Sequence, residues 1–413
     1  MLLYLQNRKN NVTSAGNPSN ENYAREFLEL FTIGRGEQEA SGIYSNYTET
    51  DINEFALLLT GFKIKSTRNG DGINPETGSD IDPETGIRTG YAYPYHHASR
   101  DKTFSNKLGN ATITGRSDAA GMMQELEDFI DVVFNQAETA RNYARKIYRY
   151  YVNTKIDESI ESAIIQPLAN HLTANNFNLV ASIKYLLKSE HFYEMCTFEG
   201  GGNIIKSPIE LLAETMSFFN TDMPSYTDGV AHFKGFINKF LFGTNHYSHH
   251  NVDRNLFIPA DPAGYPAYYQ EPLRDKNWYN ITTKPYRYNL SKYLISNPHY
   301  IANVHYTYLD TVAYANYLQD VLGVDVGDAD AMVDTMIDYL LPQSLSAERR
   351  DIIKNIFLDD LSEQNWQCEW GLYHGDGCIV APNIPPDGDE TRVRGPLDAL
   401  VIAVLSSQEF QLK

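Results

Sequence analysis

The sequence has few cysteines, no concentration of basic residues and no long hydrophobic segment. Lysine and arginine number 34 against 53 aspartates and glutamates, and the net charge is -19. This balance argues against nucleic-acid binding, because a phosphate backbone requires clustered positive charge. No apolar run approaches the roughly 18 to 20 residues that a membrane-spanning helix needs. A chain of 413 residues with 42% apolar residues is instead typical of a globular protein.

Three cysteines are too few for a disulfide framework. Cys368 and Cys378 flank a short polar segment and could pair in an exported protein, which would leave Cys196 unpaired. The alternative is three free thiols, since pairing depends on the compartment. The first ten residues lack the basic start and apolar stretch of a signal peptide.

The sustained alternation of apolar and polar residues that is typical of β-strands is nearly absent. Apolar residues recur instead at the three-to-four spacing of helices. Within residues 17–36, for example, Tyr23, Phe27 and Phe31 share one helical face. Ser207 and Glu210 around a proline form a capping box. The sequence therefore predicts a mainly α protein, a multi-helix globular scaffold, with helices that include residues 117–134, 157–173, 178–188, 308–322, 328–341, 346–358 and 396–406.

Two long regions, about 63–116 and 243–300, lack helical periodicity and are rich in turn-forming and aromatic residues. Because long loops in compact proteins are commonly functional, and because aromatic residues favour order, we predict two long ordered loops. A weak internal similarity between residues 180–192 and 398–410 suggests two lobes, 1–200 and 203–413. The alternative is one domain over residues 1–413.

Several motifs resemble a bacterial family called "domain of unknown function 1800". They occur in the family's order along essentially the whole chain: NENYAREFLELFTIGRG, YTETDINEFALLLTGF, HHASRDKTF, IKSPIELLAE, IPADPAGYPAY and LSSQEFQ. The resemblance implies a bacterial, extracytoplasmic protein (periplasmic, on the outer surface or secreted) and a single family domain over residues 1–413. Family members are often encoded beside a sulfatase-like family. They usually carry a further helical portion before this point, so we expect the export signal in an N-terminal portion absent from this chain.

One family loop typically has the pattern His-Asp-x-Gly-x-Lys. In this sequence His97 and Lys102 match it, but Ala98 replaces the acidic residue. That departure puts in doubt any role that requires an adjacent His-Asp pair. His97 and Asp101 remain the candidate catalytic residues, and an enzyme would bring them together in a concave pocket with another titratable group.

Two segments carry potential metal ligands. Residues 69–86 contain a near-repeat of Pro-Glu-Thr-Gly and supply hard oxygen ligands for calcium, without the EF-hand spacing: Asp71, Asp80, Asp82 and Glu84. A transition metal is the second candidate, on a histidine cluster that lacks the HExxH arrangement: His246, His249 and His250. The alternatives are a solvated, turn-rich insertion and surface histidines.

Tyrosine is the abundant aromatic residue, with 29 copies against 19 phenylalanines. Two loops concentrate such residues beside polar groups, in an arrangement suited to stacking on sugars or to anchoring a protein partner: Tyr91, Tyr93, Tyr95, Tyr265, Tyr268, Tyr269 and Trp278. The alternative is that these rings hold the loops on the scaffold. Arg25, Glu26 and Glu29 form a tight charged group, which we interpret as an exposed helical ion-pair ladder.

We therefore expect a binding or assembly module of the cell envelope or exterior, stabilised by calcium, with a polysaccharide or another envelope protein as its partner. The sulfatase-like family is one such protein partner. The alternative is a metal-assisted hydrolase that acts on an envelope or extracellular polymer, with His97 and Asp101 in its cleft.

Overall fold

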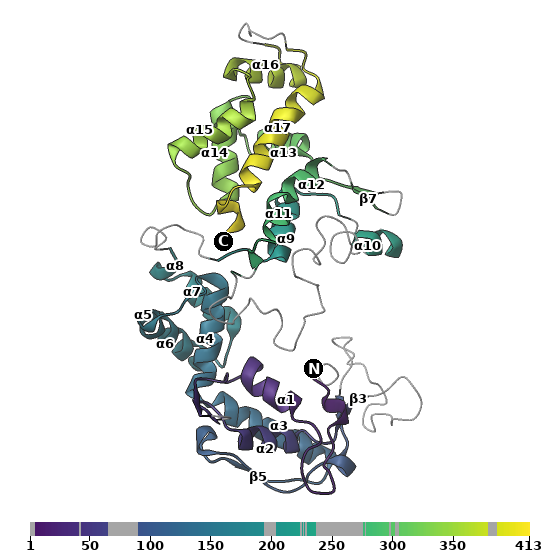
Figure 1. Cartoon of the computed structure of the whole chain (residues 1–413), viewed down its shortest axis with the longest axis vertical. Coiled ribbons are helices and arrows are strands. Elements are labelled where there is room, and N and C mark those ends of the chain that lie inside the picture. The colour runs from purple at the N-terminus through teal and green to yellow at the C-terminus, as the bar shows by residue number, and fades with distance from the viewer. Residues whose placement is uncertain are drawn as a thin grey trace. The chain divides into compact units, whose positions relative to one another are not determined.

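The protein is described by a computed structural model that is mainly α-helical, which confirms the predicted fold class (Figure 1). The described part comprises residues 5–40, 43–64, 90–193, 204–223, 225, 227, 229–236, 276, 278–296, 299–301, 305–378 and 386–413. Within it, each sheet consists of two antiparallel strands. No helix in these ranges is both long enough and apolar enough to cross a membrane.

The described residues divide into two compact units. Residues up to Phe192 form unit 1, and those from Tyr193 onward form unit 2. Each unit has its own buried hydrophobic clusters.

Unit 1 combines helices with three short hairpins. Its elements are η1 (Asn7–Lys9), α1 (Asn22–Glu26), the π-helical turn η2 (Phe27–Phe31), β1 (Gln38–Ala40), β2 (Ile43–Tyr44), α2 (Glu49–Leu58), β3 (Phe62–Ile64), β4 (Gly90–Ala92), η3 (Pro94–His96), β5 (Lys102–Thr103), η4 (Asn106–Leu108), β6 (Thr112–Ile113), α3 (Ala119–Phe134), α4 (Ala137–Tyr151), α5 (Glu158–Ile160), the π-helical turn η5 (Glu161–Ile165), α6 (Gln166–Ala174), α7 (Leu179–Leu187) and α8 (Glu190–Tyr193). The hairpins pair β1 with β2, β3 with β4, and β5 with β6.

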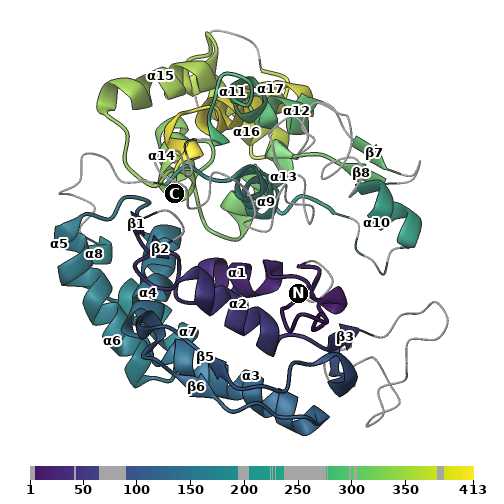
Figure 2. The same ribbon diagram turned by 60° about the horizontal axis from the view of Figure 1, so that its bottom comes forward.

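Helix α2 lies in the core of unit 1, where it packs against α1 and α3 (Figure 2). Thr48 starts it with a capping box, in which the Thr48 hydroxyl accepts from the Asp51 amide and the Asp51 carboxylate accepts from the Thr48 amide. Phe55 then stacks on Phe129 of α3 with ring centroids 3.9 Å apart. Helix α2 ends before Gly61, whose positive φ is readily adopted by glycine and whose missing Cβ would lie 2.7 Å from the carbonyl oxygen of Tyr93. A second cluster of buried side chains joins α4, α6 and α7.

Unit 2 is built around its last long helix. Its elements are α9 (Pro208–Phe218), α10 (Val230–Phe236), α11 (Lys284–Tyr288), α12 (Leu290–Ser296), β7 (His299–Ile301), β8 (His305–Thr307), α13 (Thr311–Asp320), α14 (Ala329–Leu340), α15 (Ala347–Leu358), α16 (Glu363–His374), α17 (Glu390–Leu405) and η9 (Glu409–Gln411). Helix α17 packs against α12, α13, α14, α15 and α16, and its buried residues Val393, Leu397 and Val401 recur at four-residue spacing.

The structure differs from the sequence prediction in parts of unit 2. Residues 284–296, inside the second predicted loop region, form α11 and α12. Pro285 lies in the first turn of α11, and Leu290 and Leu294 of α12 are both buried. Helix α17 begins at Glu390, before Pro396, which lies inside the helix. Cys368 and Cys378 form a disulfide that ties α16 to the segment after it.

Candidate functional site

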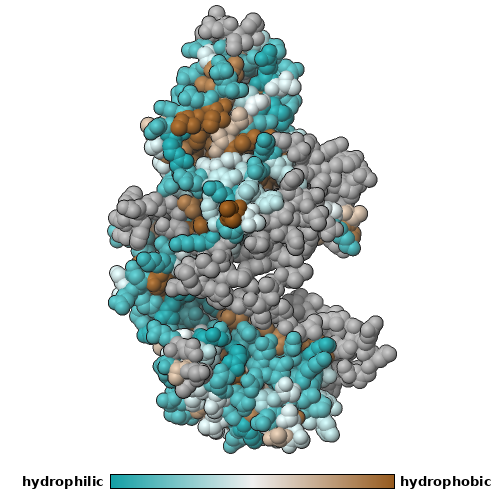
Figure 3. All heavy atoms as spheres, in the orientation of Figure 1, coloured by the Kyte–Doolittle hydropathy of each residue, from teal (hydrophilic) through white to brown (hydrophobic). Residues whose placement is uncertain are grey.

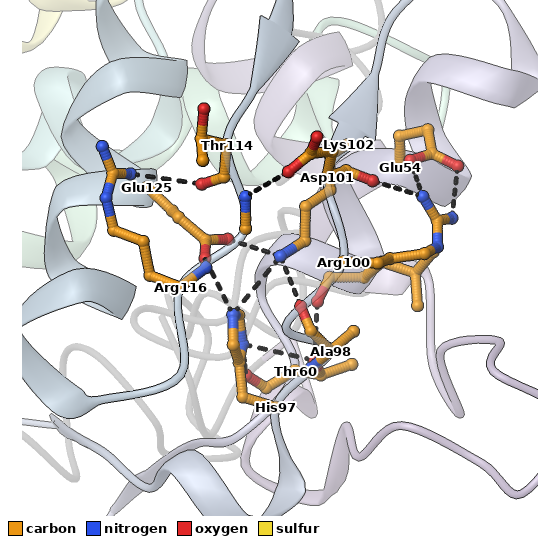
Figure 4. Close-up of polar contacts among 12 residues, drawn as sticks. Glu54, Thr60, His97, Ala98, Arg100, Asp101, Lys102, Thr114, Arg116 and Glu125 are labelled. Atoms are coloured by element: carbon orange, nitrogen blue, oxygen red, sulfur yellow. Dashed lines mark hydrogen bonds and ion pairs between the residues drawn. The ribbon is translucent and has the colours of Figure 1, made fainter.

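His97, the first catalytic candidate, follows η3 and is buried in unit 1. Its Nδ1 lies 2.9 Å from the carbonyl oxygen of Thr60, so this nitrogen carries the proton and donates it. Its Nε2 lies 3.3 Å from Oε1 of Glu125 and 3.4 Å from Nζ of Lys102 (Figure 4). The family-matching residues His97 and Lys102 therefore meet a glutamate of helix α3.

Lys102 and Glu125 form a buried ion pair, with Nζ 2.5 Å from Oε2. Lys102 also donates to the carbonyl oxygen of Ala98, and the backbone amide of Arg116 donates to Oε1 of Glu125 at 2.5 Å. Burial opposes the carboxylate charge, yet the contacts with His97 and Lys102 outweigh it and hold the pKa of Glu125 below its ordinary value. Burial lowers the pKa of Lys102, and Glu125 offsets part of that effect. We call these three side chains the buried triad.

Asp101, the second catalytic candidate, is exposed and does not join the buried triad. Its Oδ1 accepts from the amide of Gly115 at 2.8 Å, and in Figure 4 the carboxylate points toward the chain between Thr114 and Arg116. A Cβ on Gly115 would lie 2.1 Å from the carbonyl oxygen of Ser99, so only glycine allows the two segments to pass so closely. Asp101 thus links the residues just before β5 to the residues just after β6.

The charged group near the N-terminus is also structural. Arg25 binds both carboxylate oxygens of Glu49, at 2.8 and 2.7 Å, and lies 3.6 Å from Glu21. Glu29, one turn further along, pairs with Arg35 at 2.5 Å. The Arg25–Glu49 pair links α1 to the start of α2, and the Glu29–Arg35 pair links η2 to the segment after it. Ion pairs near the surface each contribute about 0 to 1 kcal/mol.

The aromatic candidates fall into different environments. Tyr93 and Tyr95 are exposed, and 82% of the Tyr95 surface is accessible. Tyr91 lies in β4, opposite Lys63. Trp278 is buried, and its carbonyl oxygen accepts from the hydroxyl of Thr283 just before α11. Trp278 therefore contributes to the packing of unit 2.

The remaining sequence candidates lie outside the described residues, and their roles stay predictions: Asp71, Asp80, Asp82, Glu84, His246, His249, His250, Tyr265, Tyr268 and Tyr269. In the part of the chain that the structure describes, no group of three or more His, Cys, Asp or Glu side chains is placed to hold a metal ion.

Unit 2 contains a concave site that the sequence candidates did not include. It has a volume of about 650 Å³ and lies beside the end of α9 and the start of α13. We call it the tyrosine groove, and it is lined by Ser217, Phe218, Phe219, Asn220, Thr221, Asp222, Tyr308, Asp310, Ala313, Tyr314 and Tyr317. Figure 3 shows hydrophobic patches on the drawn face of unit 2 that lie among polar surface.

Asp310 orders one wall of the tyrosine groove. Its carboxylate caps α13 by accepting from the amide of Ala313, and it also accepts from the hydroxyl of Tyr308 at 2.9 Å. Nη1 of Arg394 on α17 lies 3.1 Å from the same carboxylate. The Tyr308 ring is thus held in place before any ligand arrives.

Two tyrosines of α13 form the aromatic part of the groove. The rings of Tyr314 and Tyr317 are 6.2 Å apart, and 47% of the Tyr317 surface is accessible while Tyr314 is nearly buried. Burial raises the pKa of Tyr314 above its ordinary value, so its hydroxyl stays protonated in mildly alkaline solution as well as at neutral pH. The sequence predicted part of this arrangement, because the helical period over 308–322 places both tyrosines on one helix. Nothing in the local sequence indicated that α9 lies beside that helix.

A comparison of the whole chain with models of known protein families agrees with the resemblance indicated by the sequence motifs. The model of the family described as "Protein of unknown function (DUF1800)" matches residues 1–412. Neither the curated proteins nor the solved structures contain a match to this chain. Because the family model spans essentially all of its residues, the chain belongs to the DUF1800 family.

Proposed function

We propose that this protein is a binding module of the bacterial cell envelope or exterior and that its tyrosine groove binds a polysaccharide. The observation that carries the proposal is the composition of the groove. A half-exposed tyrosine, Tyr317, lines the same groove as the polar residues Asn220 and Asp222. Sugar rings stack on aromatic faces, and their hydroxyls bind amide and carboxylate groups.

The volume of the groove is consistent with a short stretch of glycan. Ligand sites typically occupy about 300 to 1,000 Å³, so about 650 Å³ suits a few sugar units. The contacts of Asp310 support binding over catalysis there, because its carboxylate is engaged by a helix cap, a tyrosine hydroxyl and an arginine. The hydrolase alternative has less support, because His97 is buried against Thr60 whereas Asp101 is exposed and binds the amide of Gly115.

The proposed location is supported by the disulfide between Cys368 and Cys378. Disulfides persist in the periplasm and outside the cell, whereas the bacterial cytosol keeps most thiols reduced. An extracytoplasmic location is also where a polysaccharide-binding protein would meet its ligand.

The groove can be tested with soluble fragments of cellulose, chitin, alginate and peptidoglycan, by calorimetric titration. We expect at least one fragment to bind and Tyr317→Ala to weaken that binding about tenfold, because one aromatic stack contributes about 1 to 2 kcal/mol. Tyr95→Ala is the matched control, since Tyr95 is an exposed tyrosine of unit 1, and it should leave binding unchanged.

Two results would contradict the proposal. Binding that is lost in Tyr95→Ala and kept in Tyr317→Ala would move the site to unit 1. Binding of no fragment, with an envelope protein such as a sulfatase-like partner bound instead, would favour the assembly role over glycan binding.

Calcium stabilisation through residues 69–86 is a further part of the proposal, and it rests on the oxygen-rich composition of that segment. Thermal unfolding with saturating calcium and with chelator tests it. We expect calcium to raise the unfolding midpoint, because a ligand that binds only the native state at 100 times its Kd adds about 2.7 kcal/mol of stability. Identical midpoints would remove calcium from the proposal.

A further inference from the structure

A second cavity adjoins the tyrosine groove in unit 2. Its volume is about 670 Å³, and we call it the apolar cavity. Its wall is mainly apolar and comprises Lys206, Ala213, Glu214, Ser217, Phe218, Tyr339, Leu340, Leu341, Pro342, Phe410, Leu412 and Lys413. Ser217 and Phe218, in the last turn of α9, line both the cavity and the groove.

The apolar cavity is held open by the packing around the end of the chain. The amide of Lys206 donates to the carbonyl oxygen of Gln411 at 2.8 Å, and Ile205 pairs with Leu412. Buried Arg287 supports this pairing, since it donates to Gln411 and to the carbonyl oxygen of Lys206. The wall is therefore formed before a ligand binds, which lowers the entropy cost of binding.

The charges of the apolar cavity are already neutralised. Nζ of Lys206 lies 2.8 Å from Glu214 and 4.1 Å from the centre of the Phe410 ring. Lys413 forms an ion pair with Glu210. Because both lysines have carboxylate partners, the wall favours an uncharged apolar group over an anion.

A continuous series of rings connects the two sites. The rings of Tyr317 and Tyr314 are 6.2 Å apart, and those of Tyr314 and Phe218 are 5.2 Å apart. Phe218 then forms part of the apolar cavity, together with the half-exposed Tyr339. Because Phe218 lines both sites, a ligand that stacks on Tyr317 lies next to the apolar cavity and can extend along Phe218 into it.

From this continuity we propose that the ligand is a glycolipid: its sugar part lies in the tyrosine groove and its acyl or alkyl chain fills the apolar cavity. The inference rests on the proposed function, because it extends the ligand of the tyrosine groove. Uncharged apolar chains suit the cavity because each methylene group that leaves water for its apolar wall lowers the free energy of the complex.

Calorimetric titration tests whether the alkyl chain contributes to binding. The ligands are maltose and the octyl, decyl and dodecyl maltosides, each below its micelle concentration. Any pyranose headgroup can stack on Tyr317, so the maltosides vary only the chain. We expect affinity to rise about fourfold for each added methylene until the cavity is full. Affinity that does not change with chain length would overturn the inference.

A variant that fills the apolar cavity tests whether the alkyl chain of the ligand binds there. Ala213 is exposed on α9 and lines the cavity, so Ala213→Trp should remove the dependence on chain length without unfolding the protein. Ala347→Trp is the matched control, because Ala347 lies at the exposed start of α15 and outside both sites. This variant should keep the dependence of affinity on alkyl-chain length. A dependence that persists in Ala213→Trp would place the chain elsewhere and refute the proposal.

The two proposals fail separately. If unmodified oligosaccharide fragments bind and depend on Tyr317, the groove binds glycans whatever the maltosides do. If Ala213→Trp abolishes maltoside binding while Tyr317→Ala leaves it unchanged, the cavity binds apolar chains independently, and the single glycolipid ligand is wrong.

Discussion

The buried triad of unit 1 and the tyrosine groove of unit 2 use polar side chains in opposite ways. In the triad, His97, Lys102 and Glu125 are buried, and they satisfy one another and nearby carbonyl groups. In the groove, Asp310 anchors the wall, while the face of Tyr317 is left exposed. The difference shows that His, Lys and Glu side chains can satisfy one another inside a core, and that an ordinary helix can leave a tyrosine face exposed at a concave surface.

The largest effect should come from breaking the triad. Glu125→Ala leaves the Lys102 ammonium buried without its carboxylate, and we expect unit 1 to lose about 3 to 5 kcal/mol of unfolding free energy. Chemical denaturation measures the loss, and glycan binding by the groove should persist where unit 2 stays folded.

A double variant separates charge from packing at this position. Glu125→Leu with Lys102→Met removes both charges and should recover a large part of the stability. A loss below about 1 kcal/mol in Glu125→Ala would show that the triad is not a structural ion pair of the core.

The disulfide should have the next largest effect, and in the other unit. The sequence separation of Cys368 and Cys378 is 10 residues, for which loop closure predicts about 2.7 kcal/mol of stabilisation. Cys368→Ser with Cys378→Ser should lower the unfolding midpoint of unit 2 and leave that of unit 1 unchanged. Reducing agent should act on the native protein in the same way and have no effect on the double variant.

Acid should also lower the unfolding free energy of unit 1, because it protonates Glu125 of the triad. The loss should be smaller than the loss that Glu125→Ala causes. Because the native pKa of Glu125 is lowered, its contribution is fully present above the unfolded value of about 4.3 and is lost as pH falls through the native pKa. Unfolding of Glu125→Gln from pH 7 to pH 3 should show a smaller loss of stability than the native protein. Parallel curves for the two proteins would argue against this linkage.

The smallest expected effect comes from the helix caps. Thr48→Ala and Ser207→Ala each remove a capping box and should cost about 1 kcal/mol, the first in unit 1 and the second in unit 2. Ser207→Ala also loosens the start of α9, so it should weaken ligand binding slightly, whereas Thr48→Ala should not. Equal effects of the two variants on binding would mean that α9 does not shape the sites.

Local signals made most helices predictable. The capping boxes at Thr48 and Ser207 and the apolar spacing of α14, α15 and α17 are all visible within about 15 residues of sequence. Helices α11 and α12 were missed because they are short and surrounded by tyrosines, prolines and asparagines, which resemble a loop.

The site was less predictable because it depends on residues far apart in sequence. The loop pattern marked His97 and Lys102, but Glu125 lies 23 residues beyond Lys102, on helix α3. The disulfide could be considered from the short separation of its cysteines, yet only the fold brings α9 beside α13 to form the groove. The contact of Asp101 was equally out of reach, because it depends on the close approach of Gly115, 14 residues further along the chain.

The last turn of α9 has a consequence for how this protein can diverge. Ser217 and Phe218 line both the tyrosine groove and the apolar cavity. A substitution at either position therefore alters both concave surfaces at once, so evolution cannot reshape one of them there without changing the other.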